Sequence, residues 1–412
     1  MQEPRLRELA NEYLVPLVAS SRIEGEGQLA GPGMKNTAFL NPQRIAFRLA
    51  KTDHFRLVLT RNQIFDKRGE GRISELTLVR AFTEALADVE QALDKPYGAT
   101  LLAGLQSAIV AKSVAGYALE STVVRVVNAL EAWAARLYEG GRISAAIGID
   151  GTAIGAGVTL EQIIREDFAA VLSNGFDTLL VVNGQAEVVG YRCLDSDSLA
   201  STNAPLRQSA VAEWANDGKV AVALNRLGEL MVFANGQLVF SRRSGRWYFL
   251  THEPVITQLL KPKNNRELRR AVYQTCLDVS FARTGGCIGV VLNEFVRKSA
   301  WHDLVPRVDD RMKSTSIKAR TITSGTQARA FQHLDRRTRA ELLAIDGATL
   351  LDQEGQFLAV GAILKIPGGS TGGGRRAAAI ALSRMGLGIK ISQDGAIAAF
   401  IGGQPDPAVA VM

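Results

Sequence analysis

Two short stretches near the C-terminus combine residue types that could bind a phosphate and a metal ion. The first is the acidic turn Asp346-Gly347-Ala348, which leads into a run of apolar residues. Glycine beside a carboxylate lets a ligand approach the backbone, and carboxylate oxygens are hard ligands for divalent cations. Asp-Gly is also a common turn, so this stretch alone does not separate a site from a turn.

The second stretch is a glycine-rich loop, Gly368–Gly374, followed directly by Arg375 and Arg376. Successive glycines can turn several backbone N–H groups toward one anion. A helix predicted over 375–385 would add its positive N-terminal end, and arginine binds phosphate oxygens through two hydrogen bonds. The alternative is a linker before an ordinary helix. The two cations at the helix start favour a site for a polyphosphate.

A similar tetrapeptide occurs earlier in the chain. Ile149-Asp150-Gly151-Thr152 has nearly the same letters as residues 345–348, but no arginine loop follows it. We expect an ordinary turn there, because the glycine loop and its arginines are what make the C-terminal stretch specific.

The elements around the candidate site predict a mixed α/β fold. Apolar residues recur at helical spacing over 266–281 and 334–344. The continuous apolar run 287–292, C-I-G-V-V-L, is typical of a strand buried on both faces. A hairpin, the helix at 375–385 and a second hairpin follow. This order predicts a mixed β-sheet with helices on its faces.

The chain is long enough for two or three domains, and we expect three regions. Residues 1–140 are predicted to be a mainly helical sensor or interaction region, with a strand at 45–59 and helices at 74–92 and 100–137. Residues 141–242 are predicted to be a sheet-rich α+β regulatory module. Residues 243–412 would hold the candidate site.

The charge of the chain is uneven. The whole sequence carries a net +7, whereas residues 243–412 hold 24 Lys and Arg against 14 Asp and Glu. A basic region attracts nucleic acid, an acidic surface or a polyphosphate. Nucleic acid is not the expected partner, because the basic residues around Arg375 are not interleaved with aromatic ones. A nucleic-acid-binding or scaffold protein remains the alternative from another functional class.

The sequence predicts a cytoplasmic protein without a membrane partner. It has no run of about 18 apolar residues and no signal-peptide pattern at its N-terminus. Its three cysteines and four histidines show no metal-ligand spacing, which is typical of a reducing compartment and argues against a structural zinc.

Taken together, the C-terminal motifs resemble the diadenylate cyclase domain, the family that condenses two ATP molecules into cyclic di-AMP. The resemblance covers roughly residues 266 to 400. Its parts, in chain order, are R-E-L-R-R-A-V, R-T-G-G-C-I-G-V-V-L-N-E, L-L-A-I-D-G-A, G-A-I-L, G-G-R-R-A-A-A-I-A-L-S and I-K-I-S-Q-D-G-A-I-A. The order and spacing of all the parts carry the resemblance, rather than any one of them.

The resemblance implies a role for each part of the site. Asp346 would bind Mg²⁺ or Mn²⁺ and help to activate a ribose 3′-hydroxyl, with Arg375 and Arg376 as further catalytic residues. Gln393 would lie at the metal. Contacts with ATP are implied for Gly347, Ala348, Leu364, Thr371, Gly372, Gly373, Gly374 and Ser392. Two such domains would have to meet face to face, which implies a homo-oligomer.

The sequence departs from the family pattern at two places. The family loop reads Gly-Thr-Arg-His-Arg, and here Gly373, Gly374 and Arg375 take the places of the threonine, the first arginine and the histidine. Gln393 takes the place of an acidic residue, although Asp394 is adjacent. Two functions follow as hypotheses. One is a diadenylate cyclase regulated by N-terminal sensor modules; the other is a catalytically degenerate, nucleotide-binding signalling protein.

Overall fold

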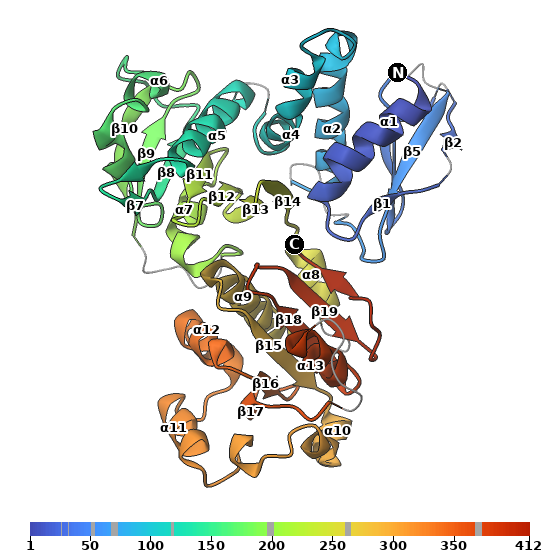
Figure 1. Ribbon diagram of the computed structural model, residues 1–412, viewed down its shortest axis with the longest axis vertical. Coiled ribbons are helices and arrows are strands. Elements are labelled where there is room, and N and C mark those ends of the chain that lie inside the picture. The colour runs from blue at the N-terminus through green and yellow to red at the C-terminus, as the bar shows by residue number, and fades with distance from the viewer. Residues whose placement is uncertain are drawn as a thin grey trace. The chain divides into compact units, whose positions relative to one another are not determined.

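The structure is a computed structural model of the chain. It describes residues 1–25, 27–31, 33–50, 54–66, 73–116, 119–195, 202–259, 265–366 and 373–412. These residues form two compact units, Met1–Thr251 and His252–Met412. Both units combine helices with β-sheet, and the mixed α/β class predicted from the sequence is confirmed (Figure 1).

The first unit begins with a helix and a small antiparallel sheet. The helix is α1 (Glu3–Leu9), and the strands are β1 (Arg22–Ile23), β2 (Gln28–Leu29), β3 (Thr37–Asn41), β4 (Arg44–Phe47) and β5 (Phe55–Thr60). The strand predicted over 45–59 is in fact two, β4 and β5, which pair antiparallel. Side-chain alternation continues through both strands, so the sequence pattern did not reveal the reversal between them.

Four α-helices follow the small sheet. They are α2 (Glu75–Val89), α3 (Gly98–Ala103), α4 (Leu105–Val114) and α5 (Glu120–Ala134). Ser74 begins α2 by accepting a hydrogen bond from the Thr77 N–H, 3.4 Å away. The helical pattern at 100–137 is therefore divided among α3, α4 and α5, and the apolar sides of α2, α4 and α5 share one core with β4 and β5.

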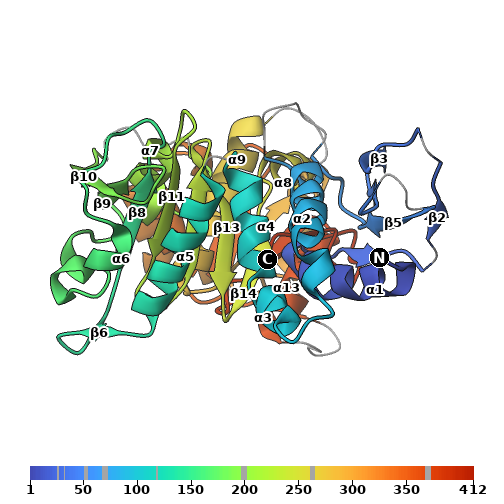
Figure 2. The same ribbon diagram turned by 90° about the horizontal axis from the view of Figure 1, so that it is seen from above.

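A seven-stranded sheet completes the first unit, in the order β10-β9-β8-β11-β12-β13-β14. Its strands are β8 (Ala145–Ile149), β9 (Thr178–Val182), β10 (Val188–Cys193), β11 (Val220–Leu224), β12 (Leu230–Ala234), β13 (Gln237–Arg243) and β14 (Arg246–Phe249). Helix α5 lies over β8 and β11 (Figures 1 and 2), and α7 (Ser209–Trp214) precedes β11. The module expected to end at residue 242 continues through β14, because β13 crosses that position and pairs with β14.

The second unit is built on a six-stranded sheet in the order β17-β16-β15-β18-β19-β20. Its strands are β15 (Gly286–Val291), β16 (Ala348–Leu351), β17 (Phe357–Ala362), β18 (Gly386–Ile391), β19 (Ile397–Ile401) and β20 (Val409–Ala410). Strands β15 and β16 run parallel, and the other neighbours are antiparallel. The predicted mixed sheet is confirmed, and β15 is buried along its whole length.

Helices cover both faces of this sheet. The unit contains α8 (Glu253–Gln258), α9 (Arg266–Ala282), α10 (Asn293–Arg297), α11 (Ile317–Gly325), α12 (Arg336–Ala344) and α13 (Gly374–Ser383). In strand β15, Gly289 faces Leu382 of α13, whereas Gly286, three residues earlier, faces Leu343 of α12. Successive residues of a strand point to opposite faces, and Gly286 and Gly289 are three residues apart. Helices α12 and α13 therefore lie on opposite sides of the sheet.

A buried ion pair joins α9 to α12. Asp278 accepts two hydrogen bonds from Arg336, at 2.7 and 3.1 Å, and neither side chain is more than 5% exposed. The guanidinium of Arg339 lies nearby, and burial lowers its pKa to about 10. Two desolvated cations thus depend on the carboxylate of Asp278, which fixes α12 and the turn that follows it.

Replacing Asp278 with alanine should cost about 3–5 kcal/mol of unfolding free energy, because it leaves a buried arginine without its counter-ion. Chemical denaturation of the full chain measures this. The matched control is Glu341→Ala, which breaks the exposed pair with Arg337 (82% and 67% exposed) and should cost no more than about 0.5 kcal/mol. Equal costs for the two variants would contradict the structural role of the buried pair.

Candidate functional site

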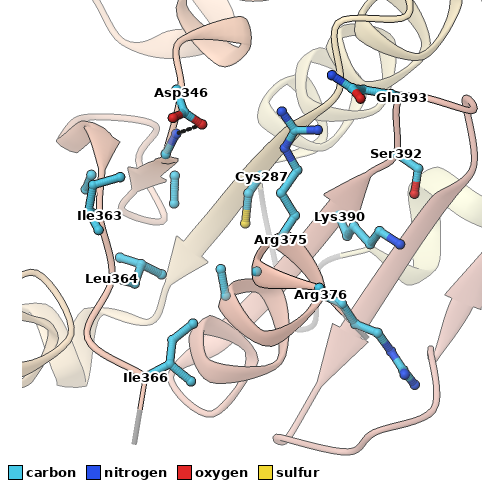
Figure 3. A pocket seen from close by; sticks show the side chains of 16 residues that line it. Cys287, Asp346, Ile363, Leu364, Ile366, Arg375, Arg376, Lys390, Ser392 and Gln393 are labelled. Carbon is cyan, nitrogen blue, oxygen red and sulfur yellow. Dashed lines mark hydrogen bonds between the residues drawn. The ribbon is translucent and has the colours of Figure 1, made fainter. Parts of the chain in front are cut away.

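A cavity of about 550 Å³ lies at one end of the sheet in the second unit (Figure 3). Its walls come from the turn before β16, the chain after β17, the start of α13 and the end of β18. The lining residues are Cys287, Asp346, Gly347, Ala348, Ala362, Ile363, Leu364, Ile366, Gly373, Gly374, Arg375, Arg376, Ala378, Lys390, Ser392 and Gln393. The volume is that of a small-molecule site.

Asp346 is an exposed carboxylate at the mouth of the cavity. It accepts a hydrogen bond from the Gly347 N–H at 3.1 Å and forms no ion pair with any described residue. Gly347 has a φ of +107°, and a Cβ there would lie 2.6 Å from the carbonyl carbon of Gly361. The close contact with β17 and the backbone angle both require glycine in this turn, which carries Asp346 at the cavity.

Arg375 stands at the first turn of α13, opposite Asp346. Its guanidinium projects toward the side where Asp346 and Gln393 lie (Figure 3). It packs against Gly285, where a Cβ would come within 2.5 Å of its Nη1. Among the residues that the structure describes, Arg375 has no hydrogen-bond or ion-pair partner. The cation is therefore held in place by packing and remains open to a ligand.

Arg376 lines the cavity with its stem, but its charged end points away from Arg375 (Figure 3). Its Nη2 donates a hydrogen bond to the carbonyl oxygen of Pro405 at 2.9 Å. The structure thus separates the two arginines that the sequence treats alike, and Arg376 would have to release Pro405 to reach a ligand.

Lys390 and Cys287 face the cavity from neighbouring strands. They are directly paired across the antiparallel ladder of β15 and β18, so both side chains lie on the α13 side of the sheet. Burial raises the pKa of the Cys287 thiol to about 12, an effect that the positive charge of Arg375 opposes. At neutral pH the thiol is protonated, and Cys287 contributes apolar surface rather than a nucleophile.

Ser392 and Gln393 form the turn between β18 and β19. The Ser392 N–H donates to the carbonyl oxygen of Ala396 at 2.8 Å, and the Gly395 N–H donates to that of Ser392 at 3.0 Å. Helix α9 contacts this turn, because the Ser280 hydroxyl donates a hydrogen bond to the carbonyl oxygen of Gly395 at 2.5 Å. The turn therefore presents Ser392 and Gln393 on a rigid base.

The opposite wall is apolar and follows the end of β17. Ile363, Leu364 and Ile366 line it, and Ile363 is half exposed. The Ile363 N–H donates to the carboxylate of Asp310 at 3.4 Å, and Asp310 in turn pairs with Lys318. This wall is anchored by a buried carboxylate, and its apolar side chains offer a surface to the flat, uncharged part of a ligand.

The sequence-predicted residues largely meet in this one cavity. All of those named above line it except Thr371 and Gly372, which lie outside the described residues together with most of the glycine loop. The turn expected at 149–152 is a turn, closed by hydrogen bonds from Thr152 to the Asp150 carboxylate that lower the pKa of Asp150.

Two polar residues that line the cavity, Cys287 and Lys390, were not predicted from the sequence, and neither were the apolar ones Ala362, Ile363, Ile366 and Ala378. Lys390 had a signal, since it is the one charged residue in the apolar strand G-L-G-I-K-I. Cys287 had none, because its place in the cavity depends on the pairing of β15 with β18.

The cavity is strongly cationic. Arg375 and Lys390 line it beside one carboxylate among the described residues, that of Asp346, whereas the guanidinium of Arg376 points away. Within the described part of the chain, no group of three or more His, Cys, Asp or Glu side chains could hold a metal by itself. A divalent ion at Asp346 would need oxygen ligands from a bound phosphate.

Comparison with known proteins gives no family for the chain. No protein-family model and no curated protein matches it. Over the described residues, no helix is both long and apolar enough to cross a membrane.

Gly347→Ala should lower the unfolding free energy by about 2–4 kcal/mol, since the new methyl group meets the backbone of β17 at a strained φ. Thermal or chemical unfolding measures the change. Gly374→Ala is the matched control in the same cavity: nothing lies within 4 Å of its Cβ position, and alanine suits the first turn of a helix. A Gly347→Ala protein as stable as the control would contradict the described turn.

Proposed function

We propose that the second unit is a diadenylate-cyclase-like nucleotidyltransferase that condenses two ATP molecules into cyclic di-AMP and pyrophosphate. The observation that carries the proposal is the arrangement across the cavity. The Asp346 carboxylate faces the Arg375 guanidinium, neither of them in an ion pair with a described residue. Arg375 stands on a helix N-terminus, and an apolar wall lies beside the two groups. Anionic, metal-binding and apolar parts of a nucleotide each have a complementary surface there.

The reaction requires few protein groups, because phosphoryl chemistry depends on positioning and on neutralised charge. The 3′-oxygen of one ATP forms a bond to the α-phosphorus of the facing ATP. The bond from that phosphorus to the bridging oxygen of the β-phosphate breaks, pyrophosphate leaves, and the hydroxyl proton is released. The same step in the opposite direction, from the 3′-oxygen of the second nucleotide to the α-phosphorus of the first, closes the ring and releases a second pyrophosphate. We assign the 3′-hydroxyl to Asp346 and the triphosphate to Arg375, Lys390 and the first N–H groups of α13.

The cavity offers one carboxylate to a divalent cation, that of Asp346. Mg²⁺ is commonly bound by one or two carboxylates together with substrate phosphates, and Asp346 offers one such carboxylate without an ion-pair partner among the described residues. Gln393 adds a neutral amide oxygen at the same end of the cavity. Mg²⁺ or Mn²⁺ would supply further charge neutralisation at the phosphates.

The same proposal includes an assembly and a location. Each cavity presents one nucleotide, so two second units from separate chains would face one another in a homo-oligomer. The first unit would act as the sensor. The three free cysteines support a reducing, cytoplasmic location, since the described chain holds Cys193, Cys276 and Cys287 without a disulfide.

The alternative is a degenerate cyclase domain that binds nucleotide and signals without turnover. Two observations favour it: Gln393 brings no negative charge to the metal, and the guanidinium of Arg376 is engaged by Pro405. Both weaken catalysis more than binding, because Arg375 and Lys390 remain at the cavity.

Incubation of the purified chain with ATP and Mg²⁺ or Mn²⁺ should yield cyclic di-AMP, detected by chromatography and mass. Asp346→Asn should lower the rate by about 100-fold or more, because it removes the charge at the reacting hydroxyl. ATP binding without product in either metal would establish the degenerate alternative. Absence of both binding and product would exclude the two hypotheses together.

Lys390→Met should weaken ATP binding by about 10-fold or more, the usual loss for one hydrogen bond to a charged phosphate. Calorimetry of the full chain measures it. Lys313→Met removes an exposed lysine of the same unit that does not line the cavity, and should leave the affinity unchanged. Equal losses in both variants would point to general charge attraction instead of a contact at the site.

A further inference from the structure

The middle of the chain has the same strand order as the second unit. Strands β10-β9-β8-β11-β12-β13 correspond, in chain order and in position, to β17-β16-β15-β18-β19-β20. The parallel pair occurs at the same place, β8 with β9 and β15 with β16. A long helix precedes each first strand, α5 or α9, and a shorter one, α7 or α13, separates the two hairpins.

The lengths of the two hairpins agree as well. In the first hairpin, Val182 pairs with Val188, and Leu351 pairs with Phe357. In the second, Leu224 pairs with Leu230, and Ile391 pairs with Ile397. In each case the same number of residues separates the paired ends.

The first turn is also closed by the same hydrogen bonds. The Asn183 Oδ1 accepts from the N–H groups of Gln185 and Glu187, at 3.0 and 2.9 Å. The Asp352 Oδ1 accepts from those of Glu354 and Gln356, at 3.0 and 2.7 Å. Strand order alone is shared by many sheets, and the equal lengths of both hairpins together with the same bonds in the first turn add to the correspondence.

Each copy also has a glycine under its shorter helix. A Cβ on Gly148 would come within 2.5 Å of Trp214 in α7, and one on Gly289 within 2.9 Å of Leu382 in α13. Each glycine follows an isoleucine in the first strand, in A-I-G-I and C-I-G-V. The helices therefore cross the two sheets at the same position.

We infer that residues 120–243 are a second copy of the fold of the second unit, in which the ligand site has been closed by its own side chains. The register gives the equivalent positions. Ile147 pairs with Leu180 where Ile288 pairs with Thr349, so counting back along the strand places Asp177 at the position of Asp346. Counting back from Trp214 and Leu382 places Arg207 at the position of Arg375.

The two charged groups at these positions are engaged within the copy. The guanidinium of Arg207 lies over the ring of Phe176, 5.7 Å from its centre. The carboxylate of Asp177 accepts a hydrogen bond from the side chain of Asn174. In the second unit, by contrast, Arg375 and Asp346 face the cavity without ion-pair partners among the described residues.

Two further polar groups of the site, Lys390 and Cys287, have no counterpart in the copy, whereas Asn225 and Arg226 stand at the positions of Ser392 and Gln393. Ala223 pairs with Ala146 where Lys390 pairs with Cys287, so the lysine and the thiol are both replaced by methyl groups. The cation at the position of Lys390 is lost, and Arg207, at the position of Arg375, stacks on the ring of Phe176. The chain therefore binds one nucleotide, in the second unit; this last step rests on the proposed function.

Calorimetry of the full chain with ATP and Mg²⁺ should give one site per chain. Arg375→Gln should abolish that binding, and Arg207→Gln should leave it unchanged. Two sites per chain, or half of the binding retained in Arg375→Gln, would overturn the inference. If no nucleotide binds, the proposed function fails, and the following measurement still decides the inference.

Closure of the copy predicts coupled effects on thermal stability. Arg207→Gln should lower the melting temperature by about 1–3 °C in the original chain and have no further effect in a Phe176→Ala background. Arg375→Gln, the equivalent change in the second unit, should not lower it. Additive effects of the Arg207 and Phe176 changes, or a larger loss in Arg375→Gln, would show that the copy is not closed by this contact.

Discussion

The site depends on how closely α13 can approach the sheet of the second unit. A Cβ on Gly388 would collide with the carbonyl oxygen of Ala379, and Leu382 fills the space over Gly289. Because the backbones of helix and strand touch, the helix has one position along β18, and its first turn is brought to the end of that strand. Arg375 meets the turn of Asp346 for this reason, and any larger residue along the contact would move the cation away from the carboxylate.

The electrostatics of the cavity follow from that position. A helix N-terminus, Arg375 and Lys390 place positive charge on one side, and the carboxylate of Asp346 stands opposite with no counter-ion among the described residues. Apolar residues after β17 separate the cavity from the segment around Asp310. The carboxylate of Asp310 holds this wall in place by accepting a hydrogen bond from the backbone N–H of Ile363. Gathering these positive charges in one cavity lowers the stability of the fold, because they repel one another, and an anionic ligand would offset the repulsion.

Much of the second unit could be predicted from the sequence because its signals are local. The apolar run at 287–292 gave β15, and Asn265 caps α9 as a helix start does, by accepting a hydrogen bond from the Leu268 N–H. The order of the motifs predicted one site containing Asp346, Arg375 and Ser392, and all three line the cavity. Lys390 with Cys287, and the turn of Arg376 toward Pro405, could not be predicted, since they depend on pairing and packing between distant segments.

The repeated fold was hidden for a related reason. Its strands share pattern and length rather than letters, as V-V-N-G-Q-A-E-V and L-L-D-Q-E-G-Q-F show for one turn. The tetrapeptide at 149–152 drew attention by its letters, yet Asp150 follows β8, whereas the position equivalent to Asp346 precedes β9 and belongs to Asp177. The equivalent residues of the two copies are therefore identified by strand pairing and not by amino-acid identity.

The most direct test of the nucleotide site is an experimental structure of the full chain with ATP and a divalent cation. We predict that the triphosphate lies at the N-terminus of α13, within hydrogen-bond distance of Arg375 and Lys390, with the metal on Asp346 and the base against Leu364. A nucleotide bound outside this cavity, or with its base at Arg375 and its phosphates in solvent, would contradict it.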